Sequence, residues 1–369
     1  MPRRSPALLR AASLGTAFVL TLAACASNAT PAPSGPGGPS TSSAAGSGLA
    51  SQYSGPPATL RLGYFPNITH ATAIVGVEGG LFGQALGPNI TFKTSTFNAG
   101  SSAAEALLSN AIDATYIGPS PAVNAFAKSS GAVKIVSGAT SAGALLVVKA
   151  GITSAAQLKG KKLATPQLGN TQDVALRTWL LGQGLKTDTQ GGGDVSIVPE
   201  DNAQTLQAFE TGAIDGAWEP EPWASRLVIE GHGTVLVNEK DLWPNGQFAT
   251  TILLVRTDYL AAHPDVIKAL LAGELAADGL INSDPARAQA LTNQGIAAIT
   301  GTKLSDAVIA AAWQNLTFTP DPIASSIKTS ADNAVKIGLL KAVSLNGITD
   351  LAILNGLLAA SGKPAVGGL

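Results

Sequence analysis

Four short segments of this sequence contain proline, three of them together with small polar residues, and each follows a stretch that reads as a strand. They are residues 65–70, 118–121, 166–171 and 218–223, and none of them contains Lys or Arg. In open α/β sheets ligands bind beyond the carboxyl ends of strands, and helix N-termini hold anions through unpaired amides and a partial positive charge. Each segment alone also fits a plain turn with a capping residue. Together they indicate a small anion bound without a cation.

Glu219 and Trp218 in the fourth segment leave two interpretations open. The Glu219 carboxylate can accept a hydrogen bond from an ammonium or amide group of a ligand, or it can pair with Arg226 at the surface. Trp218 can pack against an apolar part of a ligand, or it can belong to the hydrophobic core. In the other segments Ser120, Asn170 and Thr171 stand where both side chain and backbone can donate to an anion.

Catalytic and metal-binding patterns find little support. The chain has one Cys and three His, and the histidines at 70, 232 and 263 lack metal-ligand spacing. His70 either lines the cleft or makes a hydrogen bond at a helix start. We therefore expect no enzyme, no metal and no cofactor.

The segments lie in a chain that alternates short apolar strands with helical stretches. Strands are expected at residues 60–64, 113–117, 133–137, 145–149, 163–165, 195–198, 216–218, 235–237 and 251–256. Capping-box patterns, Ser-x-x-Glu at Ser102 and Ser-x-x-Gln at Ser154, predict the starts of two helices. Asn170 predicts a third start as an N-cap residue. After Pro264 the pattern is almost wholly helical. This alternation predicts an α/β fold with a largely parallel sheet.

A faint internal repeat supports two similar lobes. Residues 106–113 are echoed 102 residues later by residues 208–215, and each copy reads as a helix end, a turn and a strand start. Each is followed by one of the proline-rich segments. The repeat predicts two α/β lobes, each presenting such a loop, although coincidence among small residues would also give it.

The N-terminus has the anatomy of an exported lipoprotein. Arg3 and Arg4 precede an apolar run that ends Leu22-Ala23-Ala24-Cys25, and Cys25 is the only cysteine of the chain. This predicts a signal peptide over residues 1–24 and lipidation of Cys25. Residues 25–58 are rich in Ala, Ser, Gly, Pro and Thr, which predicts a flexible, disordered tether.

The length and charge of the chain limit the number of domains and the kinds of partner that it can bind. The 369 residues suffice for about two domains. Without Arg3, Arg4 and Arg10 of the leader, 20 basic residues stand against 24 acidic ones. That balance argues against a nucleic-acid-binding protein, which carries a basic face.

Several segments, in order, resemble the nitrate/sulfonate/taurine substrate-binding proteins of ABC importers. They are residues 60–67 running into His70, then 79–82, 109–113, 152–162 and 215–223. The resemblance implies a two-lobed periplasmic-binding-protein type II fold (a Venus flytrap) with a helical C-terminal extension. Lobe I would take residues 59–138 and 246–369, and lobe II residues 139–245.

The resemblance also implies the binding residues, by position in the matching segments. These are Asn67, Thr69, His70, Pro119, Ser120, Thr140, Ser141, Gly143, Asn170, Thr171, Trp218 and Glu219. An iron-dependent pyrimidine synthase of the same superfamily is similar around His70, but it needs a Cys-rich motif that this chain lacks.

We therefore expect a monomeric, lipid-anchored receptor on the outer face of the cell membrane. It would capture a small anionic or zwitterionic solute, such as an aliphatic sulfonate or taurine, and pass it to an ABC permease. An amine on the ligand would suit Glu219, whereas nitrate would find it an awkward neighbour. Nitrate or a thiamine pyrimidine precursor is the alternative solute, and an enzyme on this fold is a weaker alternative.

Overall fold

The computed structural model describes residues 52–369. Cys25, the expected signal peptide and most of the expected tether lie outside the described residues. Among the helices of residues 52–369, none is both long enough and apolar enough to cross a membrane.

The larger of two sheets has six strands. Its order is β2 (Ile90–Thr96), β1 (Ala58–Tyr64), β3 (Ala114–Ile117), β10 (Ala249–Arg256), β4 (Val133–Ala142) and β11 (Leu316–Phe318). β1 runs parallel to β2 and β3, whereas β10 is antiparallel to both β3 and β4. The carboxyl ends of the parallel strands therefore share one edge with the start of β10.

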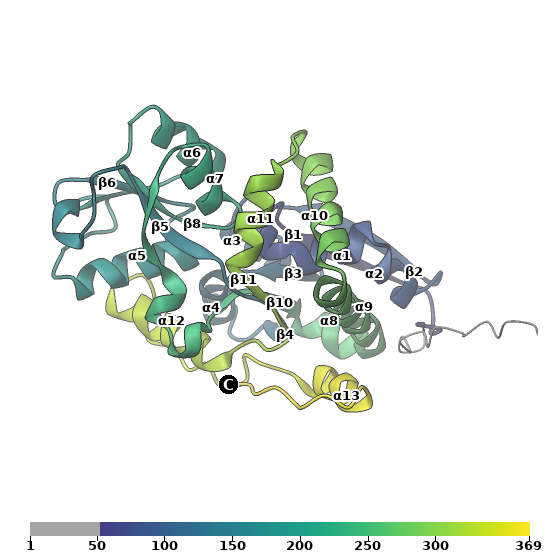
Figure 1. The fold of residues 1–369 in the computed structure, drawn as a ribbon. Coiled ribbons are helices and arrows are strands. Elements are labelled where there is room, and N and C mark those ends of the chain that lie inside the picture. Colours follow the sequence, from purple (N-terminus) through teal and green to yellow (C-terminus); the bar gives the residue numbers. More distant parts are fainter. Residues whose placement is uncertain (1–51) are drawn as a thin grey trace, which may run out of the picture. The chain divides into compact units, whose positions relative to one another are not determined.

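Helices cover this sheet, and with them it forms the first lobe (Figure 1). They are the 3-10 turn η1 (Ile68–His70), α1 (Ala71–Glu78), α2 (Leu81–Leu86), α3 (Gly100–Leu108), α4 (Pro119–Lys128), α8 (Thr257–Ala262), α9 (Pro264–Ser283), α10 (Pro285–Thr300), α11 (Asp306–Gln314), α12 (Ala324–Lys336) and α13 (Ala352–Ala360). The helical pattern expected after Pro264 is confirmed, with β11 as an addition.

The smaller sheet has five strands and forms the second lobe with three α-helices. Its order is β7 (Ser196–Pro199), β6 (Lys162–Thr165), β8 (Gly216–Pro220), β5 (Ala144–Val148) and β9 (Thr234–Asn238). The helices are α5 (Thr171–Gly182), α6 (Asn202–Glu210) and α7 (Trp223–Ile229), with 3-10 turns η2 (Ala155–Leu158), η3 (Glu239–Leu242) and η4 (Pro244–Gly246). β6 is parallel to β7 and β8, so the α/β fold is confirmed in both lobes.

The chain passes from the first sheet to the second at Gly143, directly between β4 and β5. Ala142 and Gly143 both have positive φ, 65° and 78°. A Cβ at Gly143 would lie 2.0 Å from the Leu316 side chain, so only glycine fits this tight turn. The sequence places the lobe boundary between residues 138 and 139, which lie inside β4. In the structure the chain leaves the first sheet at Gly143.

The repeat has a structural counterpart in two aspartates. Asp113 accepts a hydrogen bond from the backbone N–H of Arg61 at 2.9 Å, and Asp215 accepts one from that of Lys162 at 2.9 Å. Each aspartate begins a strand and ties it to the parallel strand beside it. The two copies thus fix equivalent strand pairs, one in each sheet.

The end of the expected tether is part of the fold. The Tyr53 N–H donates to the Ala85 carbonyl at 2.9 Å, and β1 begins at Ala58. Tyr53 is the only aromatic residue between 26 and 58, and its ring packs against the core of the first lobe. That apolar contact makes residues 53–58 ordered, contrary to the sequence prediction.

Two carboxyl groups lie buried one helical turn apart in α9. Glu274 is fully buried, and neither of its oxygens has a hydrogen-bond partner within residues 52–369. Asp278 accepts from the Thr72 hydroxyl at 2.8 Å. Burial raises the pKa of Asp278 to about 7, although Thr72 and Lys363 oppose it. Burial and the neighbouring Asp278 raise the pKa of Glu274 well above its usual range.

This pair predicts that stability falls as pH rises. The folded state holds the Asp278 proton more tightly than the unfolded state, whose pKa is near 3.8. Its contribution is therefore complete below that value and lost as the pH rises through about 7. At about 1.4 kcal/mol per pKa unit, the loss is on the order of 4 kcal/mol at most. Asp278→Asn should flatten the profile of unfolding free energy between about pH 4 and 7.

Chemical denaturation across this pH range measures the effect. The matched control is Asp332→Asn on exposed α12, which should keep the wild-type slope. A slope in Asp278→Asn equal to the wild-type slope would contradict the assignment.

Candidate functional site

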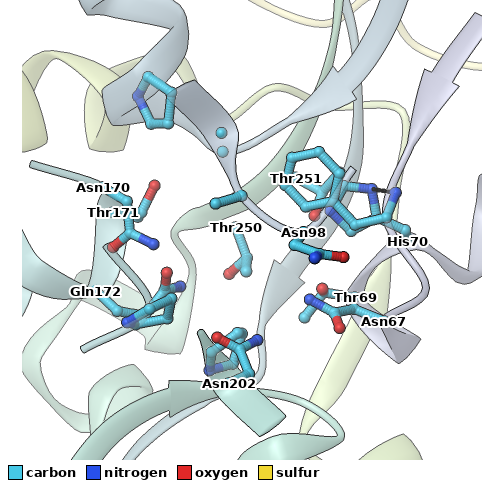
Figure 2. Close-up of a pocket in the computed structure, with 17 residues that line it drawn as sticks. Asn67, Thr69, His70, Asn98, Asn170, Thr171, Gln172, Asn202, Thr250 and Thr251 are labelled. Atoms are coloured by element: carbon cyan, nitrogen blue, oxygen red, sulfur yellow. Dashed lines mark hydrogen bonds between the residues drawn. The ribbon is translucent and has the colours of Figure 1, made fainter. Parts of the chain in front are cut away.

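A small polar cavity lies between the two lobes where the carboxyl ends of their parallel strands meet. Its volume is about 40 Å³. Figure 2 shows Asn170, Thr171 and Gln172 of the second lobe facing Asn67 and Thr69 of the first across this space. The remaining lining residues are Phe65, His70, Asn98, Ala99, Gly100, Gly118, Pro121, Pro166, Asn202, Pro220, Thr250 and Thr251. No Lys, Arg, Asp or Glu belongs to this lining.

Helix N-termini supply much of the wall. Gly100 and Asn202 are the first residues of α3 and α6, Gly118 caps α4, and Asn170 caps α5. Asn67 stands at the start of η1. The first amides of a helix have no carbonyl partner within it and carry partial positive charge. Helix starts from both sheets therefore make the cavity electropositive without a cation.

Hydroxyl groups add further donors. Thr171 and Thr251 line the cavity and are at least nine-tenths buried, yet their hydroxyl oxygens have no hydrogen-bond partner within residues 52–369. Ser120 on α4 is also buried without a hydrogen-bond partner within residues 52–369, but it does not line the cavity. Buried hydroxyls without partners are costly, so these groups are suited to a bound polar ligand.

His70 contributes as a neutral donor. Its ring stacks on Phe65 with centroids 4.4 Å apart. The Phe65 backbone N–H donates to Nδ1 at 3.4 Å (Figure 2), which leaves the proton on Nε2. Burial lowers the pKa of His70 to about 3. The histidine therefore brings no positive charge at neutral pH.

A buried ion pair between Asp173 and Arg177 of α5 holds the loop that precedes this helix. Asp173 accepts from the Gly169 N–H at 2.8 Å, from the Thr165 hydroxyl at 3.1 Å and from Arg177 Nε at 2.9 Å. Asn170 in turn accepts from the Asp173 N–H at 3.1 Å, which confirms it as the cap of α5. Asp173 and Arg177 compensate each other's charge, so the pair positions the loop without repelling an anion.

Glu219 does not line the cavity. It is fully buried, and burial raises its pKa well above the usual range, with Glu200 adding to the effect and Thr205 opposing it. The Asn202 amide lies beside it and donates to Glu219 at 3.2 Å when its oxygen faces the Trp223 indole at 3.1 Å. The indole N–H is then shared between Asn202 and Asn67, which accepts at 2.9 Å. Glu219 therefore lies behind Asn202, which does line the cavity. Arg226 pairs with Glu230 instead of Glu219, at 2.8 Å.

The other expected binding residues fall into two groups. Asn67, Thr69, His70, Asn170 and Thr171 line the cavity, whereas Pro119, Ser120, Thr140, Ser141, Gly143 and Trp218 do not. The Thr140 hydroxyl donates to the Thr69 carbonyl at 2.7 Å, and Ser141 accepts from the Phe248 N–H at 3.2 Å. These residues position the loops that form the wall. Trp218 is a core residue whose indole donates to buried Glu239 at 2.7 Å.

Several lining residues were missed from the sequence, chiefly Asn98, Gln172, Asn202, Thr250 and Thr251. Asn98 follows the unpredicted strand β2, and Asn202 opens α6 after β7. Thr250 and Thr251 belong to antiparallel β10. Only the Asn202 position carried a signal, because an amide at a helix start after a strand matches the other segments.

Hydrogen bonds join the lobes around the cavity. The Trp223 indole donates to Asn67 at 2.9 Å, and Asn315 donates to buried Glu221 at 2.7 Å. On the opposite side the Ser101 N–H donates to Gln167 at 3.2 Å. The lobes are therefore in direct contact, and the cavity lies between them.

Comparison with known sequences finds binding proteins. The chain is 28% identical over 218 residues to a Brucella abortus (strain 2308) binding protein, and 30% identical over 178 residues to the taurine-binding periplasmic protein of Escherichia coli K12. These alignments cover 58% and 47% of this chain. They span 64% and 52% of the relatives' own lengths.

Solved structures show the same fold. The nitrate-binding protein NrtA of Synechocystis PCC 6803 superposes with a TM-score of 0.71 at 18% identity, covering 82% of this chain and 89% of that one. The alkanesulfonate-binding protein SsuA of Xanthomonas axonopodis pv. citri, bound to MOPS, gives 0.68 at 23% identity, with coverages of 81% and 100%. The two-lobed periplasmic-binding-protein fold expected from the sequence is confirmed.

These relatives are binding proteins, in line with the expectation that the chain is not an enzyme. The resemblance to nitrate, sulfonate and taurine binders is confirmed. The model of the NMT1-like family matches residues 54–295. Because that match covers well over half of the 369 residues, this protein belongs to the NMT1-like family.

Proposed function

We propose that the protein is the solute-binding component of an ABC importer and captures a small anion between its two lobes. The observation that carries the proposal is the convergence of helix N-termini from both sheets on one uncharged polar cavity. Amides and hydroxyls in such a site bind an anion by directed hydrogen bonds. Because each lobe supplies part of the wall, a bound anion would favour the closed arrangement of the lobes.

An aliphatic sulfonate or taurine is the preferred solute. A sulfonate spreads one charge over three oxygens, and the wall offers donors from several directions. The named relatives bind taurine and alkanesulfonate, which supports this class. Taurine's ammonium would not meet Glu219 directly, so the sulfonate head carries the argument.

Nitrate and bicarbonate are the second candidates. Other relatives of this chain are nitrate-binding and bicarbonate-binding proteins. Glu219 does not line the cavity, and burial raises its pKa well above the usual range, so it is a weaker objection to nitrate than the sequence suggested. A thiamine pyrimidine precursor remains an alternative solute of the same fold.

We also propose that the protein works as a monomer at the outer face of the membrane, anchored through lipidated Cys25. The sequence Leu22-Ala23-Ala24-Cys25 and the uncharged segment that follows support this placement. A permease in the same membrane would receive the solute when the lobes open.

Thermal unfolding of residues 48–369 with a panel of solutes tests the proposed function. A ligand at 100 times its dissociation constant adds about 2.7 kcal/mol to the stability, which raises Tm by several degrees. We expect taurine or an alkanesulfonate to raise Tm more than nitrate, bicarbonate, sulfate or a pyrimidine. A larger shift with nitrate or bicarbonate would move the solute to that class, and no shift with any anion would contradict an anion receptor.

Gly118→Ala should weaken anion binding without unfolding the protein. Gly118 has φ −70° and ψ 153°, which alanine adopts freely. The added Cβ would lie 2.5 Å from the Thr171 hydroxyl oxygen of the other lobe, so this hydroxyl would have to leave its position in the cavity wall. We expect at least a tenfold higher Kd by calorimetry, with Tm of the unliganded protein nearly unchanged.

The control for this variant is Gly182→Ala at the end of α5, where a Cβ meets no atom within 4 Å. It should bind as the wild type does. Equal affinity of Gly118→Ala and wild type would exclude this cavity as the binding site.

Cys25→Ser should release the protein from the membrane. The hydroxyl of serine cannot form the thioether that anchors a bacterial lipoprotein, so we expect the variant in the soluble extracytoplasmic fraction. Fractionation and labelling with a fatty-acid analogue measure this. An unlabelled wild-type protein would contradict the anchor and leave the binding proposal intact.

A further inference from the structure

Two asparagines from opposite lobes line the cavity and meet at one hydrogen-bond donor. Asn67 precedes η1 in the first lobe, and Asn202 opens α6 in the second (Figure 2). Both are more than nine-tenths buried. The indole nitrogen of Trp223 lies 2.9 Å from the Asn67 oxygen and 3.1 Å from the Asn202 amide. Trp223 itself does not line the cavity, so it can affect a ligand there only through these amides.

A side-chain amide can turn either of two ends toward a ligand. Its oxygen accepts hydrogen bonds and its NH₂ group donates them, and the two orientations have nearly the same shape. An anion is attracted by the NH₂ end and repelled by the oxygen. Amides in the wall therefore help to bind an anion only when their oxygens are held away from it.

The Trp223 indole fixes the orientation of both amides because an indole N–H can only donate. Asn67 accepts from it, which engages the Asn67 oxygen and leaves the NH₂ group for a ligand. Asn202 must also turn its oxygen to the indole, since an NH₂ group at that place would face another donor. One N–H shared between two oxygens is a three-centre hydrogen bond.

Glu219 is not sufficient to set the orientation of Asn202. An ionised carboxylate accepts from the NH₂ group, but a protonated carboxyl can also donate to the amide oxygen. Burial raises the pKa of Glu219, which favours its protonated form, whereas the indole has one state only. With its oxygen on Trp223, Asn202 donates one hydrogen to Glu219 at 3.2 Å and keeps the other for a ligand.

The indole is held by the second lobe. Trp223 begins α7, and its ring packs against the buried apolar residues of that lobe. Arg226 stacks over the ring at 4.6 Å and is itself paired with Glu230 at 2.8 Å. Because Asn67 belongs to the first lobe, its amide is fixed in this way only while the two lobes are in contact.

We propose that Trp223 is a positioning residue that makes the cavity selective for anions. Its N–H turns the oxygens of Asn67 and Asn202 toward itself, so each lobe presents an NH₂ group to the solute. This inference rests on the proposed function, because an anion must bind in the cavity. Removal of the indole N–H alone distinguishes the two proposals.

Trp223→Phe keeps an aromatic ring and removes the N–H. Both amides could then turn their oxygens toward the cavity, so we expect anion affinity to fall at least tenfold. Calorimetry with methanesulfonate, nitrate and bicarbonate measures the loss. Replacement of Trp223 by benzothienylalanine, which has sulfur in place of N–H in a ring of nearly the same shape, should give the same loss.

A double-mutant cycle separates this role from a structural role of the ring. Asn67→Ala removes one of the two amides that Trp223 orients. In that background the loss caused by Trp223→Phe should be at least about threefold smaller than in the wild type, because contacting residues are coupled. Equal losses in both backgrounds would contradict an action through Asn67.

Trp243→Phe is the matched control. The Trp243 indole also donates to a buried carboxyl, that of Glu239 at 3.3 Å, but neither residue lines the cavity. This variant should bind as the wild type does. Wild-type affinity in Trp223→Phe or in the benzothienylalanine protein would overturn the role of Trp223 and leave the anion cavity in place. Failure of the wild type to bind any of the three anions would overturn both proposals.

Discussion

Helix amides that face one another across the gap between two sheets impose the central constraint on this molecule. Each sheet brings the carboxyl ends of its parallel strands to the gap, and the helices that follow begin there. The partial charge at a helix start acts only within its first turn, so the lobes must meet closely. The tight turn at Gly143 and the bonds from Trp223 and Asn315 hold them together.

The surroundings of the cavity keep full negative charge away from it. Asp173 is compensated by Arg177, burial raises the pKa of Glu219 and so disfavours its charged form, and His70 is neutral. A dipole-based site is weak compared with a guanidinium, so an unpaired carboxylate nearby would cancel much of its attraction. The same need to keep full charge away from the site explains why the loop side chains are amides and hydroxyls instead of charged groups.

The sequence predicted the fold and about half of the wall, for identifiable reasons. Apolar strands followed by proline and small polar residues located the loops at Asn67 and Asn170, and the box at Ser154 is confirmed. The box at Ser102 was wrong, because α3 begins earlier, at Gly100. Strand β2 escaped notice since most of this edge strand is exposed and polar. Thr251 lies in the cavity only because β10 sits beside β3, and strand order is set by tertiary packing.

The absence of Lys and Arg from the cavity lining also affects how fast an anion in solution would reach the site. Attraction between full charges in solution is screened within about 8 Å at physiological ionic strength, and it usually accelerates the encounter of charged partners. Short hydrogen bonds inside an enclosed cavity are screened far less. If the site captures an anion as proposed, it does so without electrostatic steering, and the capture should change little with the ionic strength of the medium.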